Sequence, residues 1–114
     1  MIEDDERLAK MVGDYLRQSG FGFAHAADGV HGLSAVQLTP PDLVILDLML
    51  PDMDGLATAE NIRSLGLAHA PLVIMVTAFA SVDSAIDAIK AGAWDYITKP
   101  VDSDELQAKI QALN

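Results

Sequence analysis

Two short apolar runs constrain the fold of this chain more than any other feature. Leu43–Leu46 leads into Asp47, and Leu72–Val76 leads into Thr77. Prolines bound the first run on both sides, and both runs are too short for ordinary buried helices. The first run is therefore predicted to be a strand buried on both faces, with the second beside it, as is typical of a parallel sheet covered by helices.

Amphipathic helical patterns alternate with these strands. Apolar residues spaced three and four apart predict a helix from Glu6 capped by Asp5, and a weaker helix after Asp28-Gly29. Asp54 and Asp102 can cap two more helices. The remaining predicted elements are short strands at 1–2, 21–26 and 94–98, and a helix from Ser81 or Asp83 with Ile86 and Ile89 facing inward.

Strands and helices thus alternate about five times in one domain, residues 1–114. This alternation predicts a doubly wound α/β fold of flavodoxin-like order 2-1-3-4-5, a five-stranded parallel sheet with helices on both faces. Only Met1-Ile2 precede the acidic cluster at 3–6, so the first strand is predicted to be truncated.

Composition excludes several classes of function. The formal net charge is −10, which argues against direct binding of nucleic acid or of anionic membranes. No apolar run is long enough to span a bilayer. The absence of cysteine excludes disulfides and thiolate metal sites, and a soluble cytoplasmic protein is expected.

Polar residues follow four of the predicted strands. Because the carboxyl ends of parallel strands open on one edge, we expect Glu3, Asp4, Asp47, Thr77 and Lys99 to converge there. Three neighbouring carboxylates need a cation, and Mg²⁺ suits oxygen ligands. A carboxylate in such a site can attack phosphorus, with ammonium and hydroxyl groups facing the transferred oxygens. These residues predict phosphoryl transfer onto Asp47.

The chain resembles the receiver domain of two-component response regulators of the chemotaxis or nitrogen-regulation type. The matching pieces are the acidic cluster at 3–6, Leu46-Asp47-Leu48-Met49-Leu50-Pro51 with Gly55, Val76-Thr77-Ala78, Gly92-Ala93 with Asp95-Tyr96, and Lys99-Pro100. The resemblance implies a phosphoacceptor signalling domain rather than an enzyme. It also implies that a sensor histidine kinase or a phosphotransfer protein donates the phosphoryl group to Asp47.

The resemblance also assigns a metal site. Asp4, Asp47 and the backbone carbonyl of Met49 would bind Mg²⁺, with Glu3 bound directly or through a water molecule. The bulky Met49 and Phe79 would shield the acyl phosphate from water, which implies slow autodephosphorylation.

A switch is implied as well. Thr77 would move towards the phosphoryl group while Tyr96 turns inward, and Lys99-Pro100 would carry a cis peptide. The face of the fourth helix and fifth strand would then control an output domain or downstream protein, with transcription as the expected output. A phosphorylation-dependent homodimer is a further expected partner state.

Two alternatives stay open on the sequence alone. A pseudo-receiver would bind a partner without phosphorylation, although the acceptor, threonine and lysine are all present. A haloacid-dehalogenase-type phosphohydrolase needs a second aspartate two residues after the nucleophile, where this chain has Met49.

Overall fold

The computed structural model describes residues 1–68, 70–78, 86–87, 89–90 and 92–112. The helices and strands are α1 (Glu6–Gln18), α2 (Gly29–Leu38), β1 (Leu43–Asp47), α3 (Gly55–Ser64), β2 (Leu72–Thr77), β3 (Asp95–Thr98) and α5 (Ser103–Gln111). The predicted helix start at Ser81 or Asp83 lies outside the described residues.

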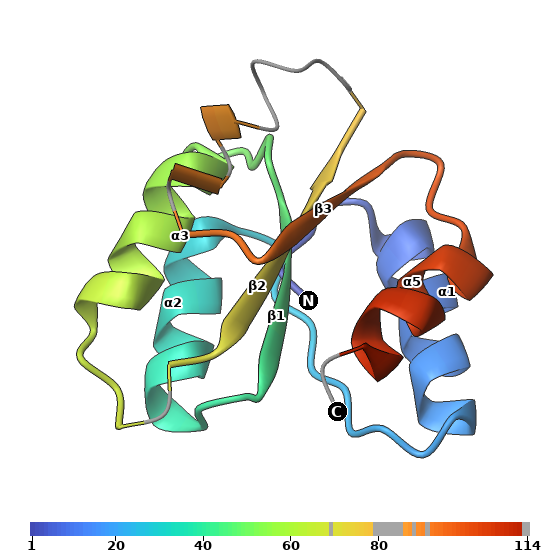
Figure 1. Ribbon diagram of the computed structural model, residues 1–114. Coiled ribbons are helices and arrows are strands. Elements are labelled where there is room, and N and C mark those ends of the chain that lie inside the picture. Colours follow the sequence, from blue (N-terminus) through green and yellow to red (C-terminus); the bar gives the residue numbers. More distant parts are fainter. Residues whose placement is uncertain (69, 79–85, 88, 91, 113–114) are drawn as a thin grey trace.

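The centre of the fold is a parallel sheet in the order β1-β2-β3. Its register pairs Asp47 with Val76 and Thr77 with Thr98, so the carboxyl ends of the three strands lie at one edge. Helices α2 and α3 cover one face, and α1 and α5 cover the other (Figure 1). The predicted α/β architecture with helices on both faces is confirmed.

Each face of the sheet has its own apolar core. On the α2 and α3 side, Val36 and Ile62 pack with Leu46 and Met75. On the α1 and α5 side, the core contains Ile74 and Ile97 from the sheet, together with the helix residues Val12, Leu16, Leu106 and Ile110. The two strand runs are therefore apolar because both of their faces are covered.

The predicted aspartate caps are confirmed. Asp5 accepts hydrogen bonds from the backbone N–H groups of Arg7 and Leu8 at the start of α1. Asp54 and Asp102 do the same for α3 and α5, and Asp28, which was predicted only as part of a turn, caps α2. Each carboxylate satisfies N–H groups that a helix leaves unpaired at its first turn.

The N-terminal segment lies between two others. Ile2 forms parallel bridges to Ala26 on one side and to Leu46 on the other. This arrangement is consistent with the predicted order 2-1-3-4-5. However, the expected strand at 21–26 is wrong in extent, because only Ala26 forms a bridge. A strand needs a partner along its length, and Ile2 pairs with this segment only at Ala26.

The Met1 amine is tied to the chain at 21–26. The Met1 amine donates a hydrogen bond to the carbonyl of Ala24 at 2.7 Å. Burial lowers the pKa of this amine from 8.0 to about 6. The amine thus occupies the place that a backbone N–H would take in a sheet.

One predicted burial is wrong. Ile86 and Ile89 were expected to face inward, but 46% and 52% of their surfaces are exposed. A periodic pattern places apolar residues on one helix face, but it does not specify what covers that face.

No helix in the described part of the chain has both the length and the apolar content needed to cross a bilayer.

Candidate functional site

Asp47 is the last residue of β1, and only 4% of its surface is exposed. Its Oδ1 accepts a hydrogen bond from the Met49 backbone N–H at 3.1 Å. Its Oδ2 lies 3.5 Å from the Nζ of Lys99. One carboxylate oxygen is therefore held by the following loop, and the other faces a cation.

Glu3 and Asp4 lie beside this carboxylate. One carboxylate oxygen from each of Glu3, Asp4 and Asp47 falls within 4.8 Å of the other two. Glu3 is fully buried, whereas Asp4 is exposed. The bridge of Ile2 to Leu46 brings the two acids to the end of β1. The predicted convergence of these three residues is present in the structure.

Lys99 follows β3 and forms ion pairs with two carboxylates. Its Nζ lies 2.7 Å from Oε1 of Glu3, closer than its 3.5 Å distance from Asp47. Partial burial pulls the pKa of Lys99 down, but the two neighbouring carboxylates outweigh this effect and raise it overall. Lys99 therefore stays charged at the centre of the site.

Glu3 has an unusual environment for a carboxylate. Burial raises its pKa from 4.5 to about 7; the nearby Asp47 carboxylate adds to the rise and the Lys99 ammonium opposes it. The contact with Lys99 is close enough for an ion pair, but neither oxygen of Glu3 has a well-oriented hydrogen bond among the described residues. A buried carboxylate with unsatisfied oxygens beside two others fits a hard divalent cation such as Mg²⁺.

Thr77 ends β2 and is buried, with 4% of its surface exposed. Its carbonyl accepts a hydrogen bond from the Lys99 N–H at 2.7 Å, which ties the chain after β3 to the end of β2. The Lys99-Pro100 peptide is cis, as the resemblance to receiver domains implied. The structure therefore brings Asp47, Thr77 and Lys99 together.

Two other predicted site residues are more exposed than Asp47 and Thr77. Met49 follows Asp47 in the loop and is 63% exposed, and Tyr96 on β3 is 37% exposed. Phe79, predicted to shield the acyl phosphate together with Met49, lies outside the described residues.

Asp52, in the loop after Asp47, is a residue whose contacts the sequence did not reveal. Its carboxylate accepts hydrogen bonds from the N–H groups of Gly29 at 2.8 Å and Val30 at 3.0 Å, at the start of α2. These two N–H groups lower the pKa of Asp52. The loop after Asp47 is thereby tied to a second helix. Several acidic residues in this loop indicate that one of them caps a helix, but they do not indicate which helix is capped.

Gly55 closes this loop against the strand. Its N–H donates to the Leu48 carbonyl at 2.8 Å. A Cβ atom at this position would lie 2.5 Å from the carbonyl oxygen of Asp47. The absence of a side chain allows the start of α3 to approach the end of β1 closely.

Comparison with known proteins identifies the family. A model of the response regulator receiver domain matches residues 1–111 of the chain. The chain belongs to this family. As a receiver domain it is a signalling domain, and the flavodoxin-like fold class is that of the solved receivers it resembles.

Several relatives are transcriptional regulators. The receiver domain is 34% identical over 113 residues to the DNA-binding dual master transcriptional regulator RpaA of Synechocystis, covering 99% of this chain and 47% of the relative. It is 40% identical over 111 residues to the transcriptional regulatory protein ZraR of Salmonella typhimurium, covering 97% and 25%. The chain thus spans about half or less of the length of these curated relatives.

Solved structures agree with this assignment. A CheY-like response regulator receiver domain protein from Methanospirillum hungatei superimposes with a TM-score of 0.90 at 30% identity, covering 98% of this chain and 88% of that chain. The receiver domain of NtrX from Brucella abortus gives 0.87 at 28% identity, covering 97% and 92%.

Proposed function

We propose that this receiver domain takes a phosphoryl group onto Asp47 from a phosphohistidine of a sensor kinase or of a phosphotransfer protein. The observation that carries the proposal is the buried carboxylate of Asp47. It lies at a strand end, 3.5 Å from the Lys99 ammonium and within 4.8 Å of the other two carboxylates. The membership in the receiver family supports the same chemistry.

In the transfer, an Asp47 carboxylate oxygen forms a bond to phosphorus as the P–N bond of the phosphohistidine breaks. The electron pair of that bond returns to the imidazole nitrogen. The Lys99 ammonium offsets charge on the phosphoryl oxygens, and the Thr77 hydroxyl donates a hydrogen bond to one of them. The Met49 N–H fixes the orientation of the acceptor carboxylate.

The acidic residues would hold Mg²⁺ beside the acceptor. Glu3, Asp4 and Asp47 supply the carboxylates, and the Met49 backbone carbonyl is the proposed further ligand. When bound, Mg²⁺ would supply positive charge to the transferred group. The cluster of three carboxylate oxygens and the unsatisfied oxygens of Glu3 support this assignment.

Phosphorylation would then shift the receiver between two packing arrangements. We infer that Thr77 and Tyr96 form the switch pair, with Thr77 moving to the phosphoryl group and Tyr96 turning inward. Tyr96 and Trp94 are partly exposed, at 37% and 40%. Their surface would contact the output domain or a downstream protein, or a second copy in a homodimer. The names of the relatives favour control of transcription.

Labelling with acetyl phosphate tests the acceptor. The unsubstituted domain should incorporate one phosphoryl group in Mg²⁺, and Asp47→Asn should remove incorporation. Asp14→Asn is the matched control, because Asp14 pairs with Lys10 on α1 and not with the site. Persistent labelling of Asp47→Asn would exclude this residue as the acceptor. Absence of any labelling, together with no beryllofluoride-induced spectral shift in Mg²⁺, would instead favour a pseudo-receiver.

The same labelled protein reports the lifetime of the acyl phosphate. Slow autodephosphorylation is proposed because Met49 and Phe79 are bulky and apolar. Loss of the label within seconds in Mg²⁺ would contradict this shielding.

A further inference from the structure

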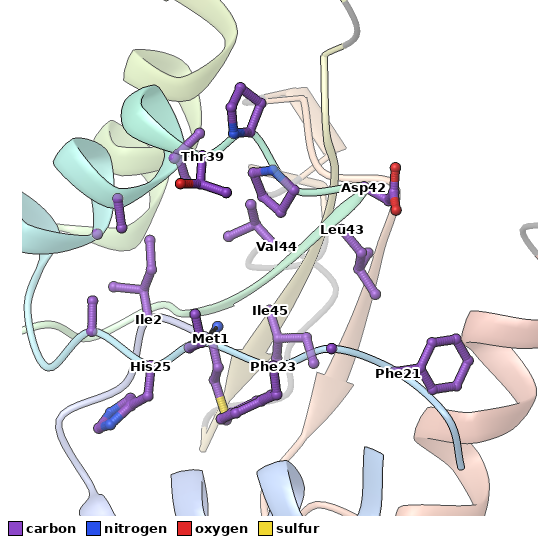
Figure 2. A pocket seen from close by; sticks show the side chains of 18 of the residues that line it. Met1, Ile2, Phe21, Phe23, His25, Thr39, Asp42, Leu43, Val44 and Ile45 are labelled. Carbon is purple, nitrogen blue, oxygen red and sulfur yellow. Dashed lines mark hydrogen bonds between the residues drawn. The ribbon is translucent and has the colours of Figure 1, made fainter. Parts of the chain in front are cut away.

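The side chain of His25 is turned towards the main chain of the acidic residues at 3–4. His25 borders a groove beside the N-terminal segment, and Figure 2 shows its imidazole pointing away from Val44, which also lines this groove. Its Nε2 lies 2.6 Å from the backbone carbonyl oxygen of Glu3. Because a carbonyl oxygen only accepts hydrogen bonds, this ring nitrogen carries a hydrogen and donates it. His25 therefore holds the main chain of a proposed metal ligand.

This hydrogen bond takes the place of a rung in a parallel ladder. Ile2 and Ala26 form a bridge. It consists of hydrogen bonds from the Ala26 N–H to the Met1 carbonyl and from the Glu3 N–H to the Ala26 carbonyl, both at 2.9 Å. In a ladder that continued, the Asp28 N–H would donate to the Glu3 carbonyl. Asp28 instead begins α2 as its N-cap, and the imidazole supplies the donor.

The carbonyl of Glu3 and the N–H of Asp4 belong to one planar peptide unit. A hydrogen bond that fixes the carbonyl therefore fixes the orientation of the plane between the two Cα atoms that carry the acidic side chains. Among the described residues, Lys99 forms an ion pair with Glu3 but not with Asp4. The direction of the exposed Asp4 side chain consequently depends on its main chain, which the imidazole holds.

We propose that His25 is a positioning residue of the metal site, whose Nε2–H orients the peptide unit between Glu3 and Asp4 so that both carboxylates face Asp47. The role rests on the proposed function, because the acids are positioned for the Mg²⁺ that they would hold. His25 is not itself a ligand in this arrangement, since the ligand atoms that lie within 4.8 Å of one another come from the three acids. Hydrogen bonds from outside a ligand set orient the ligands and tune metal affinity.

Three variants separate the hydrogen bond from the shape of the side chain. His25→Phe keeps a planar ring and removes the donor, whereas His25→Gln retains an N–H that can reach the Glu3 carbonyl. His31→Phe is the matched control, because the His31 imidazole contacts Asp28 at the start of α2 and not the acids of the site. Mg²⁺ titration of tyrosine and tryptophan fluorescence should give a dissociation constant about tenfold larger for His25→Phe. The other two variants should stay near the value of the unsubstituted domain.

Thermal unfolding in metal-free buffer distinguishes positioning from simple support of the fold. Weaker Mg²⁺ binding that His25→Gln restores, at similar Tm values of the variants, supports the proposal. Unchanged Mg²⁺ affinity in His25→Phe, or equal losses in His25→Phe and His25→Gln, would overturn it. His25→Asn, which is too short to reach the Glu3 carbonyl, provides the same comparison if His25→Phe does not fold.

A measurement on the metal-free protein tests the role of His25 apart from Mg²⁺ binding. The residual dipolar coupling of the Asp4 N–H reports the orientation of the peptide unit, and it should change in His25→Phe but not in His25→Gln. Imidazole nitrogen chemical shifts should place the hydrogen of neutral His25 on Nε2. An unchanged coupling or a neutral Nδ1–H tautomer would overturn the proposal.

Failure of the proposed function has a different signature. Absence of Mg²⁺ binding by the unsubstituted domain would overturn the metal part of the proposed function, and with it the role of His25 towards a metal. Mg²⁺ binding that persists unchanged in His25→Phe would leave the metal site in place and overturn the role of His25 alone.

Discussion

The two halves of the sheet are built very differently. On one side of Ile2, β1, β2 and β3 form continuous parallel ladders, whereas on its other side a single bridge joins Ile2 to Ala26. The complete half carries Asp47, Thr77 and the chain leading to Lys99. The open half carries Glu3 and Asp4. The proposed phosphoacceptor part of the site thus rests on a continuous ladder, and the proposed metal part rests on two bridges.

Because of this difference, substitutions in the two halves should affect different properties of the domain. A change in the complete half should lower the stability of the whole domain, because its side chains fill the cores on both faces. A change at the N-terminal segment should act first on the position of the two acids. The following predictions compare the halves.

Truncation in the two halves should give the largest contrast. Ile74 in β2 is fully buried, and Ile74→Ala should lower the free energy of unfolding by about 2–5 kcal/mol. Ile2→Ala should cost less because the groove already borders Ile2, but it should weaken Mg²⁺ binding more than Ile74→Ala does. Urea unfolding and Mg²⁺ titration of tyrosine and tryptophan fluorescence measure the two effects. Equal loss of Mg²⁺ affinity in both variants would show that the N-terminal segment has no special role in positioning the two acids.

Replacing one glycine by alanine in each half compares how tightly the two halves are packed. Gly55→Ala should destabilise the domain by about 1–3 kcal/mol, because its Cβ would meet backbone atoms of Asp47 and Leu48. Gly22→Ala in the open half meets nothing within 4 Å and should stabilise it by about 0.4–1 kcal/mol through the unfolded state. Thermal unfolding of the two variants is the measurement. A stable Gly55→Ala protein with unchanged Tm would show that α3 can move away from β1.

The pH dependence tests the buried acid of the open half. The pKa of Glu3 is about 7 in the folded state against 4.5 ordinarily, so the folded protein holds this proton more tightly. Stability is therefore highest below pH 4.5 as far as this group is concerned, and it falls as the pH rises through 7. The loss should be about 1–2 kcal/mol once solvent screening is allowed for.

Urea unfolding in metal-free buffer, from below pH 4.5 to above pH 7, measures this loss of stability. Glu3→Gln should abolish it, while Glu60→Gln on the exposed side of α3 should leave it intact. The Met1 amine contributes in the opposite sense between pH 6 and 8, because its pKa is lowered. A decline that persists in Glu3→Gln would assign it to another group.

The smallest expected effect concerns Asp52, which connects the acceptor loop with the open half. Asp52→Asn should weaken the hydrogen bonds to Gly29 and Val30, so their amides should exchange faster while Tm falls only slightly. Asp42→Asn, an exposed acid before β1, provides a control. Unchanged exchange at Gly29 and Val30 would show that the contact contributes nothing to α2.

The sequence predicted most of the complete half. Leu43–Asp47 and Leu72–Thr77 form strands because their apolar character reflects burial on two faces, which is local information. The caps were predictable for the same reason, since Asp5 or Asp54 bonds N–H groups two or three residues on. The convergence of the site residues also followed, because parallel strands end at one edge.

The remainder depends on contacts between distant segments. Only Ala26 of the segment 21–26 forms a bridge, to Ile2, and no local pattern in 21–26 shows this. The reach of Asp52 to α2 and the exposure of Ile86 and Ile89 depend on where helices lie in space. The five-strand order and the roles of the site residues stay predictions.

Lys99 links the proposed metal site to the proposed acceptor. Its ammonium lies nearer to Glu3, at 2.7 Å, than to Asp47, at 3.5 Å. A cation bound at Glu3 would compete with Lys99 for that carboxylate and leave the ammonium to Asp47. Under the proposed function, the lysine would offset the charge of Glu3 while no metal is bound and would face the phosphoryl group once one is. Metal binding at the acidic residues and the approach of Lys99 to Asp47 would thus be two results of a single exchange of ionic partners.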